Sequence, residues 1–184
     1  MISIYDIDIE GIVYIIGMKS GFKVRVFNRR DSERVIKLIS NVIVNEFKFK
    51  LEFDSLDSDI ICIEEHYNIY NAGCFWVTES NDNNTDNQII GTIAIRNLKQ
   101  FEFTCELKRM YVLREFRRLG IGQKMLDTAI DFAKSVGYKR IVLDSSKHLD
   151  AARTLYLKKG FVDIRRYNDN YRADVFMEKK LLSN

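Results

Sequence analysis

Hydrophobic and polar residues alternate along the first half of the chain and then recur at helical steps. Residues 22–27 alternate with period two, which predicts a strand, and apolar positions over residues 35–43 then mark one face of a helix. A second helix is predicted over residues 56–71 from a partly helical apolar spacing. Strands are predicted next at residues 74–78, 89–95 and 103–112, and they would form an antiparallel meander.

The second half of the chain alternates between helical and extended patterns. An amphipathic helix is predicted to begin near Met125, with a buried strand over residues 139–143 after it. Another helix should bury Leu155 and Tyr156 and end at Gly160, and two closing strands are expected over residues 161–166 and 174–180. A strand–helix–strand unit after antiparallel strands predicts an α/β fold, a mixed α+β sheet with helices on both faces.

Length and composition indicate a globular chain. Its 184 residues suit one domain, with 46% hydrophobic and 30% charged residues. We expect a core over residues 22–182, and an extension over residues 1–21 that holds one or two strands and adds an edge strand or a homodimer contact. The polar tract from residue 79 to 88 is expected to be a hairpin loop.

Cysteine usage and hydropathy bear on location. Cys62, Cys74 and Cys105 are scattered and odd in number, which favours free thiols in a reducing compartment over disulfides or a metal site. No apolar run reaches the length of a membrane span, and the N-terminus lacks a signal-peptide pattern. We therefore expect a cytoplasmic protein that acts without a membrane and without a metal.

Charge is distributed unevenly along the chain. The first 100 residues carry 11 basic and 15 acidic side chains, whereas residues 101–184 carry 18 basic and 11 acidic ones. This asymmetry fits an anionic ligand on the basic half and a cationic one facing the acidic half, although chance surface charge explains it equally well. No element interleaves basic residues with exposed aromatics, so nucleic-acid binding is not expected.

One stretch carries the clearest chemistry. Residues 107–112 read as a strand, a basic loop with Arg117 and Arg118 follows, and Gly120 and Gly122 precede the helix at Met125. The unpaired N–H groups at a helix N-terminus favour an anion, and glycine lets the backbone approach it closely. An ordinary strand-to-helix turn with a solvated loop is the alternative.

Two signatures in this half resemble the GNAT superfamily of N-acetyltransferases. Residues 117–122, RRLGIG, are similar to its acetyl-CoA loop R/Q-x-x-G-x-G/A, and residues 155–161, LYLKKGF, are similar to its second signature LYxKxGF. The resemblance implies a GNAT-like sheet splayed between its fourth and fifth strands, with acetyl-CoA in the gap. It also implies that backbone groups of Met110, Tyr111 and Val112 hold the pantetheine arm. The pyrophosphate would then bind backbone N–H groups of Arg117, Arg118, Leu119, Gly120, Ile121, Gly122 and Gln123.

The resemblance also implies catalytic roles. Tyr156, the tyrosine of the second signature, would be the general acid that protonates the leaving thiolate, because a phenol stays protonated at neutral pH. On local pattern alone it would be a core aromatic. Glu106 matches the position of the glutamate base of some members, but an acceptor contact or a structural carboxylate fits it as well.

The implied function is transfer of an acetyl group from acetyl-CoA to a primary amine of a small molecule or protein. A non-catalytic CoA-binding regulatory or sensor domain is the alternative, and an interaction domain with a chance glycine loop is the third. In the family the first two helices rim the acceptor pocket, so Glu64, Glu65 and His66 become candidate acceptor contacts, with a solvated helix face as the plainer interpretation.

Overall fold

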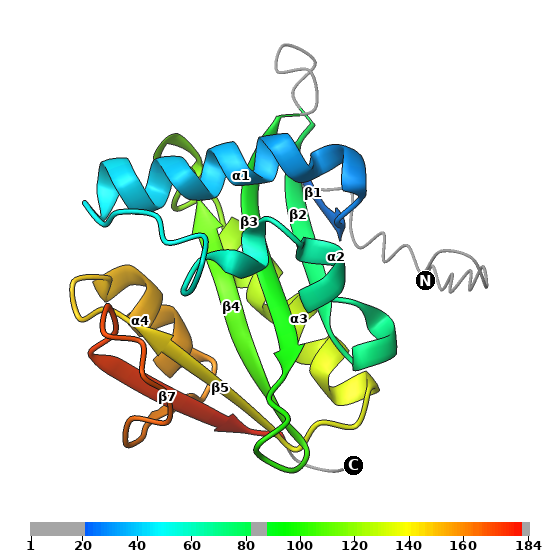
Figure 1. The fold of residues 1–184 in the computed structure, drawn as a ribbon, viewed down its shortest axis with the longest axis vertical. Coiled ribbons are helices and arrows are strands. Elements are labelled where there is room, and N and C mark those ends of the chain that lie inside the picture. The colour runs from blue at the N-terminus through cyan, green and yellow to red at the C-terminus, as the bar shows by residue number, and fades with distance from the viewer. Residues whose placement is uncertain (1–20, 82–87, 182–184) are drawn as a thin grey trace.

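The computed structural model describes residues 21–81 and 88–181 (Figure 1). The strands predicted within residues 1–20 and the loop residues 82–87 lie outside the described residues. Across the described ranges, one seven-stranded sheet has the order β1-β2-β3-β4-β5-β7-β6. Its strands are β1 Phe22–Val26, β2 Cys74–Ser80, β3 Ile89–Asn97, β4 Thr104–Val112, β5 Arg140–Ser145, β6 Val162–Asp163 and β7 Val175–Lys180.

The sheet is antiparallel except at one junction. β4 and β5 run parallel, and their pairing begins at Thr104↔Arg140 and ends at Leu107↔Leu143. Both strands continue beyond that last pair, and Figure 1 shows them diverging there. The mixed sheet predicted from the sequence is thus confirmed, and it splays between β4 and β5.

Helices cover both faces of the sheet. α1 (Ser32–Ser40) continues as a π-helical turn over Asn41–Glu46 and lies across the near face in Figure 1, whereas α3 (Ile121–Ser135) lies behind the sheet. α4 (Asp150–Lys158) packs beside α3 through Tyr156, in the same hydrophobic cluster. The shorter helical segments are α2 (Ile63–His66) and 3-10 turns at Arg29–Asp31, Ser58–Ile60, Ile69–Asn71 and Arg114–Phe116.

The helix predicted over residues 56–71 is not continuous. This stretch forms two 3-10 turns around the single-turn α2 instead. Asp57 and Asp59 turn inward to meet Arg109, and Asn68 caps the second 3-10 turn by accepting from the Asn71 N–H. Buried ion pairs and a local cap therefore override the weak apolar spacing.

The closing strands are shorter than predicted, because β6 holds only Val162 and Asp163. Beyond it the chain bends around Arg166, whose guanidinium donates to the carbonyls of Asn170 and Ala173. These bonds fix the loop between β6 and β7, and that loop reaches the mouth of the β4–β5 gap.

A β-bulge in β4 sets the direction of its side chains. The β3–β4 register shifts between Thr92 and Ala94, and Arg109 sits at a φ of 53°. The Thr92 hydroxyl donates to the Arg109 carbonyl at 2.8 Å and holds the bulge. As a result Met110 packs into the α3 side of the sheet, whereas Arg109 and Tyr111 face the α1 side.

Candidate active site

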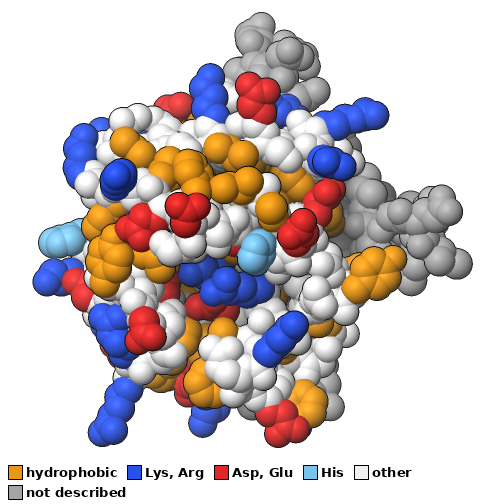
Figure 2. Space-filling view, viewed as in Figure 1, with side chains coloured by type: hydrophobic (Ala, Val, Ile, Leu, Met, Phe, Trp, Pro, Cys, Tyr) orange, Lys and Arg blue, Asp and Glu red, His pale blue; other side chains and the backbone are white. Residues whose placement is uncertain are grey.

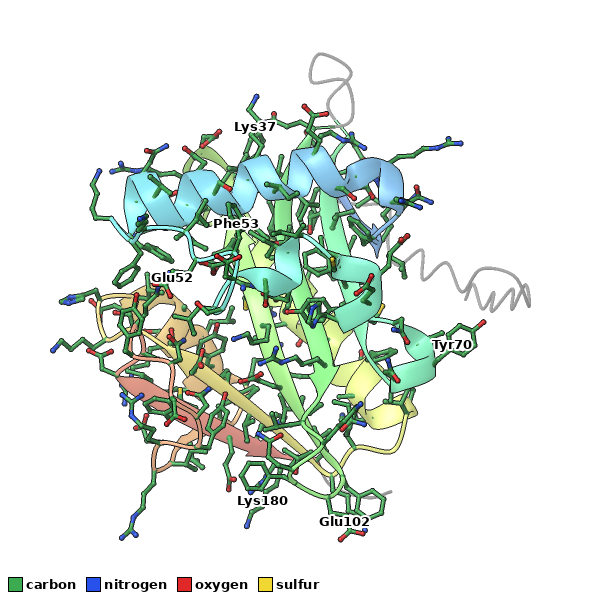
Figure 3. The ribbon with its side chains drawn as sticks, viewed as in Figure 1. Lys37, Glu52, Phe53, Tyr70, Glu102 and Lys180 are labelled. Atoms are coloured by element: carbon green, nitrogen blue, oxygen red, sulfur yellow. The ribbon has the colours of Figure 1, made fainter. Side chains whose placement is uncertain are left out.

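A cavity opens where β4 and β5 diverge. It has a volume of about 530 Å³ and is lined by residues 107–111 of β4, Asp144 and Ser145 of β5, and Tyr156 of α4. Figure 2 shows basic and acidic side chains gathered in a hollow at the centre of this face. Glu52 and Phe53, labelled in Figure 3, belong to the segment that crosses between α1 and this opening.

The glycine loop ends at the N-terminus of α3. Gly120 is the N-cap residue with a φ of 80°, and a Cβ placed on it would meet no atom within 4 Å. Lys124 donates the first helical hydrogen bond, to the Gly120 carbonyl, so the N–H groups of Ile121, Gly122 and Gln123 have no partner within the helix. This geometry suits an anion close to the backbone.

Arg117 ties this loop to α1. Its Nε donates to the Val112 carbonyl at 2.9 Å, and its Nη2 pairs with Glu46 Oε2 at 2.7 Å. The Val112 carbonyl is therefore already an acceptor. Of the predicted ligand-binding residues, Met110, Tyr111 and Arg117 line the cavity. The others, Val112, Arg118, Leu119, Gly120, Ile121, Gly122 and Gln123, are not among its lining residues.

Tyr156 lies at the inner wall of the cavity. Its side chain is buried, its ring packs against Phe161, and its hydroxyl donates to the Met110 sulfur at 3.5 Å. Burial, and then its interactions with Tyr111 and Asp144, raise the pKa of Tyr156 above its ordinary value. The hydroxyl is thus protonated at neutral pH, and the Met110 sulfur to which it donates is a weak acceptor.

Glu106 occupies a different environment. It is buried in β4, pairs with Arg96 at 2.6 Å, and accepts from the Tyr167 hydroxyl at 2.9 Å and from Asn168 at 3.3 Å. It is not a lining residue of the cavity. Both carboxylate oxygens are therefore engaged by neighbouring side chains.

A buried ionic cluster on the α1 side of β4 escaped the sequence analysis. Arg109 pairs with Asp57 at 3.0 Å and with Asp59, which also accepts from the Tyr67 hydroxyl. Arg172, from the β6–β7 loop, pairs with Asp57 at 2.9 Å. Burial alone would raise the pKa of Asp59, but Arg109 outweighs it and lowers that pKa to about 2.

This ionic cluster joins three segments that are distant in sequence. It consists of Asp57, Asp59, Tyr67, Arg109 and Arg172. Nothing local in the sequence marks it, because its residues are common surface types and their pairing is decided by the fold. Arg109 is one of three charged residues in β4, with Glu106 and Lys108, so its charge alone does not single it out.

The predicted rim residues lie elsewhere. Glu64, Glu65 and His66 are exposed on α2 and do not line the cavity. In the described part of the chain, Cys62, Cys74 and Cys105 are free thiols, and no group of three potential metal ligands was found. Residues 21–81 and 88–181 also include no helix that is long and apolar enough to cross a membrane.

Comparison with known proteins identifies the family. Residues 41–161 match the model of the Acetyltransferase (GNAT) family, which is more than half of the chain. The chain belongs to the GNAT acetyltransferase family. The resemblance inferred from the two signatures is thereby confirmed.

Curated relatives of this GNAT chain are N-acetyltransferases by name. It is 32% identical over 129 residues to "Probable N-acetyltransferase camello" of Xenopus laevis, covering 67% of this chain and 57% of the relative. It is 36% identical over 109 residues to "N-acetyltransferase family 8 member 3" of Rattus norvegicus, covering 58% of this chain and 46% of the relative. The chain thus spans about half the length of the curated relatives it matches.

Solved structures share the fold. An acetyltransferase of the GNAT family from Staphylococcus aureus Mu50 is 28% identical with a TM-score of 0.78, covering 88% of this chain and 99% of that one. YncA from Salmonella typhimurium, a structure with acetyl-CoA, is 17% identical with a TM-score of 0.68 and covers 90% and 96% of the two chains. Because YncA is only 17% identical to this chain, its similarity supports the fold alone.

Proposed function

We propose that this chain transfers an acetyl group from acetyl-CoA to a primary amine of a small molecule or a protein. The observation that carries the proposal is the position of Tyr156, a buried phenol at the wall of the β4–β5 cavity. Among the described residues its one hydrogen-bond partner is the Met110 thioether. Family membership and the acetyl-CoA in the YncA structure support the choice of donor.

The residues present fit acetyl-CoA. Its pyrophosphate would accept from the N–H groups of Ile121, Gly122 and Gln123, where the φ of Gly120 keeps the backbone exposed. The pantetheine arm would lie along the edge of β4 at Met110 and Tyr111, beyond the last residue that pairs with β5. Acetyl-CoA supplies an acetyl group already activated as a thioester.

Tyr156 would act on the leaving sulfur. As the amine nitrogen forms the new C–N bond and the C–S bond breaks, the sulfur takes the Tyr156 proton, and the proton lost by the amine restores the phenol through solvent. The raised pKa keeps the hydroxyl protonated until the thiolate forms beside it. A positioned acid of this kind is worth about 10²–10⁴-fold in rate.

For Glu106, the contacts support the structural alternative among the three that the sequence left open. Its carboxylate binds Arg96, Tyr167 and Asn168, and it is not among the lining residues of the cavity. As a base it would have to break the Arg96 ion pair at each turnover. We therefore assign it to holding the β6–β7 loop against β4.

The test is acetyl-CoA titration by calorimetry, followed by thiol release with an amine panel. Tyr156→Phe should lower kcat by about 10²–10⁴-fold and change the Kd for acetyl-CoA by less than about threefold. Tyr138→Phe is the matched control, because Tyr138 is also buried but donates to the Ala72 carbonyl far from the cavity.

Three results would contradict parts of this proposal. Wild-type turnover in Tyr156→Phe would remove the acid role. Binding of acetyl-CoA without thiol release from any amine would indicate a non-catalytic CoA-binding domain. Absence of binding would remove the assignment of the glycine loop as well.

A further inference from the structure

Two charged residues lie where β4 and β5 separate. Lys108 and Asp144 each follow a member of the last pair between the strands, Leu107 and Leu143. Residues that lie side by side on paired parallel strands direct their side chains to the same face of the sheet. The side chains of Lys108 and Asp144 are therefore on one face. Both line the large cavity and also a smaller recess of about 240 Å³ beside it, which Asn168 and Asn170 line too.

Neither charge forms an ion pair in the described part of the chain, although Lys108 acts electrostatically on Asp59, which lines the smaller recess too and is itself paired with Arg109. Asp144 Oδ2 accepts from the amides of Asn168 at 2.6 Å and Asn170 at 3.2 Å, but no cation pairs with it. Lys108 is partly buried, and its ammonium makes no hydrogen bond or ion pair with a described residue. The nearby arginines differ, because each pairs with a carboxylate: Arg96, Arg109 and Arg172.

Asp144 also lies near the proposed site of acetyl transfer. Its charge is one of the causes that raise the pKa of Tyr156, and both residues line the same cavity. A cation held at Asp144 would therefore lie near the phenol and the bond that breaks. Lys108 would then contact the part of the same acceptor molecule that extends toward the smaller recess.

We propose that Lys108 and Asp144 form the acceptor subsite and select an amine that carries a carboxylate close to its nitrogen. Asp144 binds the ammonium before it loses its proton, and Lys108 binds the carboxylate. The inference rests on the proposed function, since it names the substrate class of that site.

Electrostatics decides between acceptor classes. An amino-acid-like acceptor carries two unlike charges close together, and Asp144 and Lys108 offer the complementary charges from adjacent strands at the point where these separate. Loss of a charge-assisted hydrogen bond to the acceptor lowers its affinity by about tenfold or more. A polyamine would instead bring a second positive charge toward Lys108, which has no ion pair with a described residue, and this like-charge contact disfavours it.

The test compares matched acceptors by kcat/KM: the standard amino acids, their amides, the amines lacking the carboxylate, and spermidine. We expect at least one amino acid to exceed its amide and its amine by about tenfold or more. Lys108→Met should reduce that preference to within about threefold by raising KM for the amino acid only. Asp144→Asn should lower kcat/KM for every acceptor by about tenfold or more.

Two variants serve as controls. Lys99→Met removes an exposed lysine from the β3–β4 turn, and Asp163→Asn removes an exposed carboxylate from β6, so neither should change the preference. Acetyl-CoA titration of each variant verifies that it is folded.

The experiment distinguishes failure of the proposed subsite from failure of the proposed acetyltransferase activity. Thiol release that favours amides, simple amines or spermidine, or a preference that survives Lys108→Met, would overturn the subsite and leave the acetyltransferase intact. Release with no acceptor of any class would overturn both. A preference that disappears in Lys108→Met but persists in the Lys99→Met control would support the subsite.

Discussion

The glycine loop and the ionic cluster flank the same cavity, but they are built in opposite ways. The loop is local: the Gly120 φ, the first turn of α3 and the Arg117 bond to Val112 all fall within a dozen residues. The cluster is assembled across the chain, since Arg109 and Asp59 are 50 residues apart and Arg172 and Asp57 are 115 apart. The proposed donor site therefore depends on one short segment, whereas the proposed acceptor side depends on the whole fold.

The largest expected effect comes from Arg109→Met. Removing this guanidinium leaves the buried Asp59 with the Tyr67 hydroxyl as its one remaining hydrogen-bond donor among the described residues, whereas Asp57 keeps its pair with Arg172. Breaking a buried pair in this way costs about 3–5 kcal/mol. At about 2–4 °C per kcal/mol for a chain of this size, Tm should fall by roughly 6–20 °C.

Thermal unfolding measures that fall, and Arg114→Met is the control because Arg114 is an exposed residue of the 3-10 turn after β4. Below its Tm, the Arg109→Met variant should still bind acetyl-CoA within about tenfold of wild type. An unchanged Tm would mean that the cluster contributes nothing to stability. Loss of acetyl-CoA binding in the folded variant would contradict the separation between the two regions.

The same contrast explains what the sequence could predict. The strands and α3 follow from periodicity, because each pattern is local to its segment. The glycine loop follows from a short motif, and the splay between β4 and β5 was implied by the family resemblance. The helix predicted over residues 56–71 was wrong, because Asp57 and Asp59 are pulled inward by an arginine 50 residues away. Glu106 was recognisable as a strand carboxylate, but its partners Tyr167 and Asn168 arrive from the far end of the chain.

Gly120→Asp should have the next largest effect, on the donor side. An aspartate adds a negative charge and a side chain beside the proposed pyrophosphate site, at a φ of 80° that aspartate and asparagine tolerate alike. Together these cost about 3 kcal/mol, so calorimetry should show a Kd for acetyl-CoA raised by about 100-fold or more. Gly120→Asn is the matched control, because asparagine has the same shape, tolerates this conformation and carries no charge.

The two substitutions separate the charge from the added side chain. Gly120→Asn should retain acetyl-CoA binding within about fivefold of wild type. Equal losses in both variants would show that the added side chain, not its charge, determines binding at this loop. Wild-type affinity in the aspartate variant would place the pyrophosphate elsewhere.

Glu106→Gln should have the smallest effect, and it tests whether Glu106 belongs to the acceptor-side scaffold or to the chemistry. Glutamine keeps an oxygen for Tyr167 but leaves Arg96 without its anion, so stability should fall by about 1–3 kcal/mol. Because the carboxylate is not part of the cavity lining, kcat should fall by less than about tenfold and the pH profile should keep its shape.

Glu178→Gln is the control for that variant, since its pair with Arg140 at 3.4 Å is partly exposed and contributes little. A loss of about 10²-fold or more in kcat, together with loss of the acidic limb of the pH profile, would return Glu106 to the role of base. In that event the Arg96 ion pair would have to open during turnover, and the cavity of the working enzyme would extend one residue further down β4 than it does in this structure.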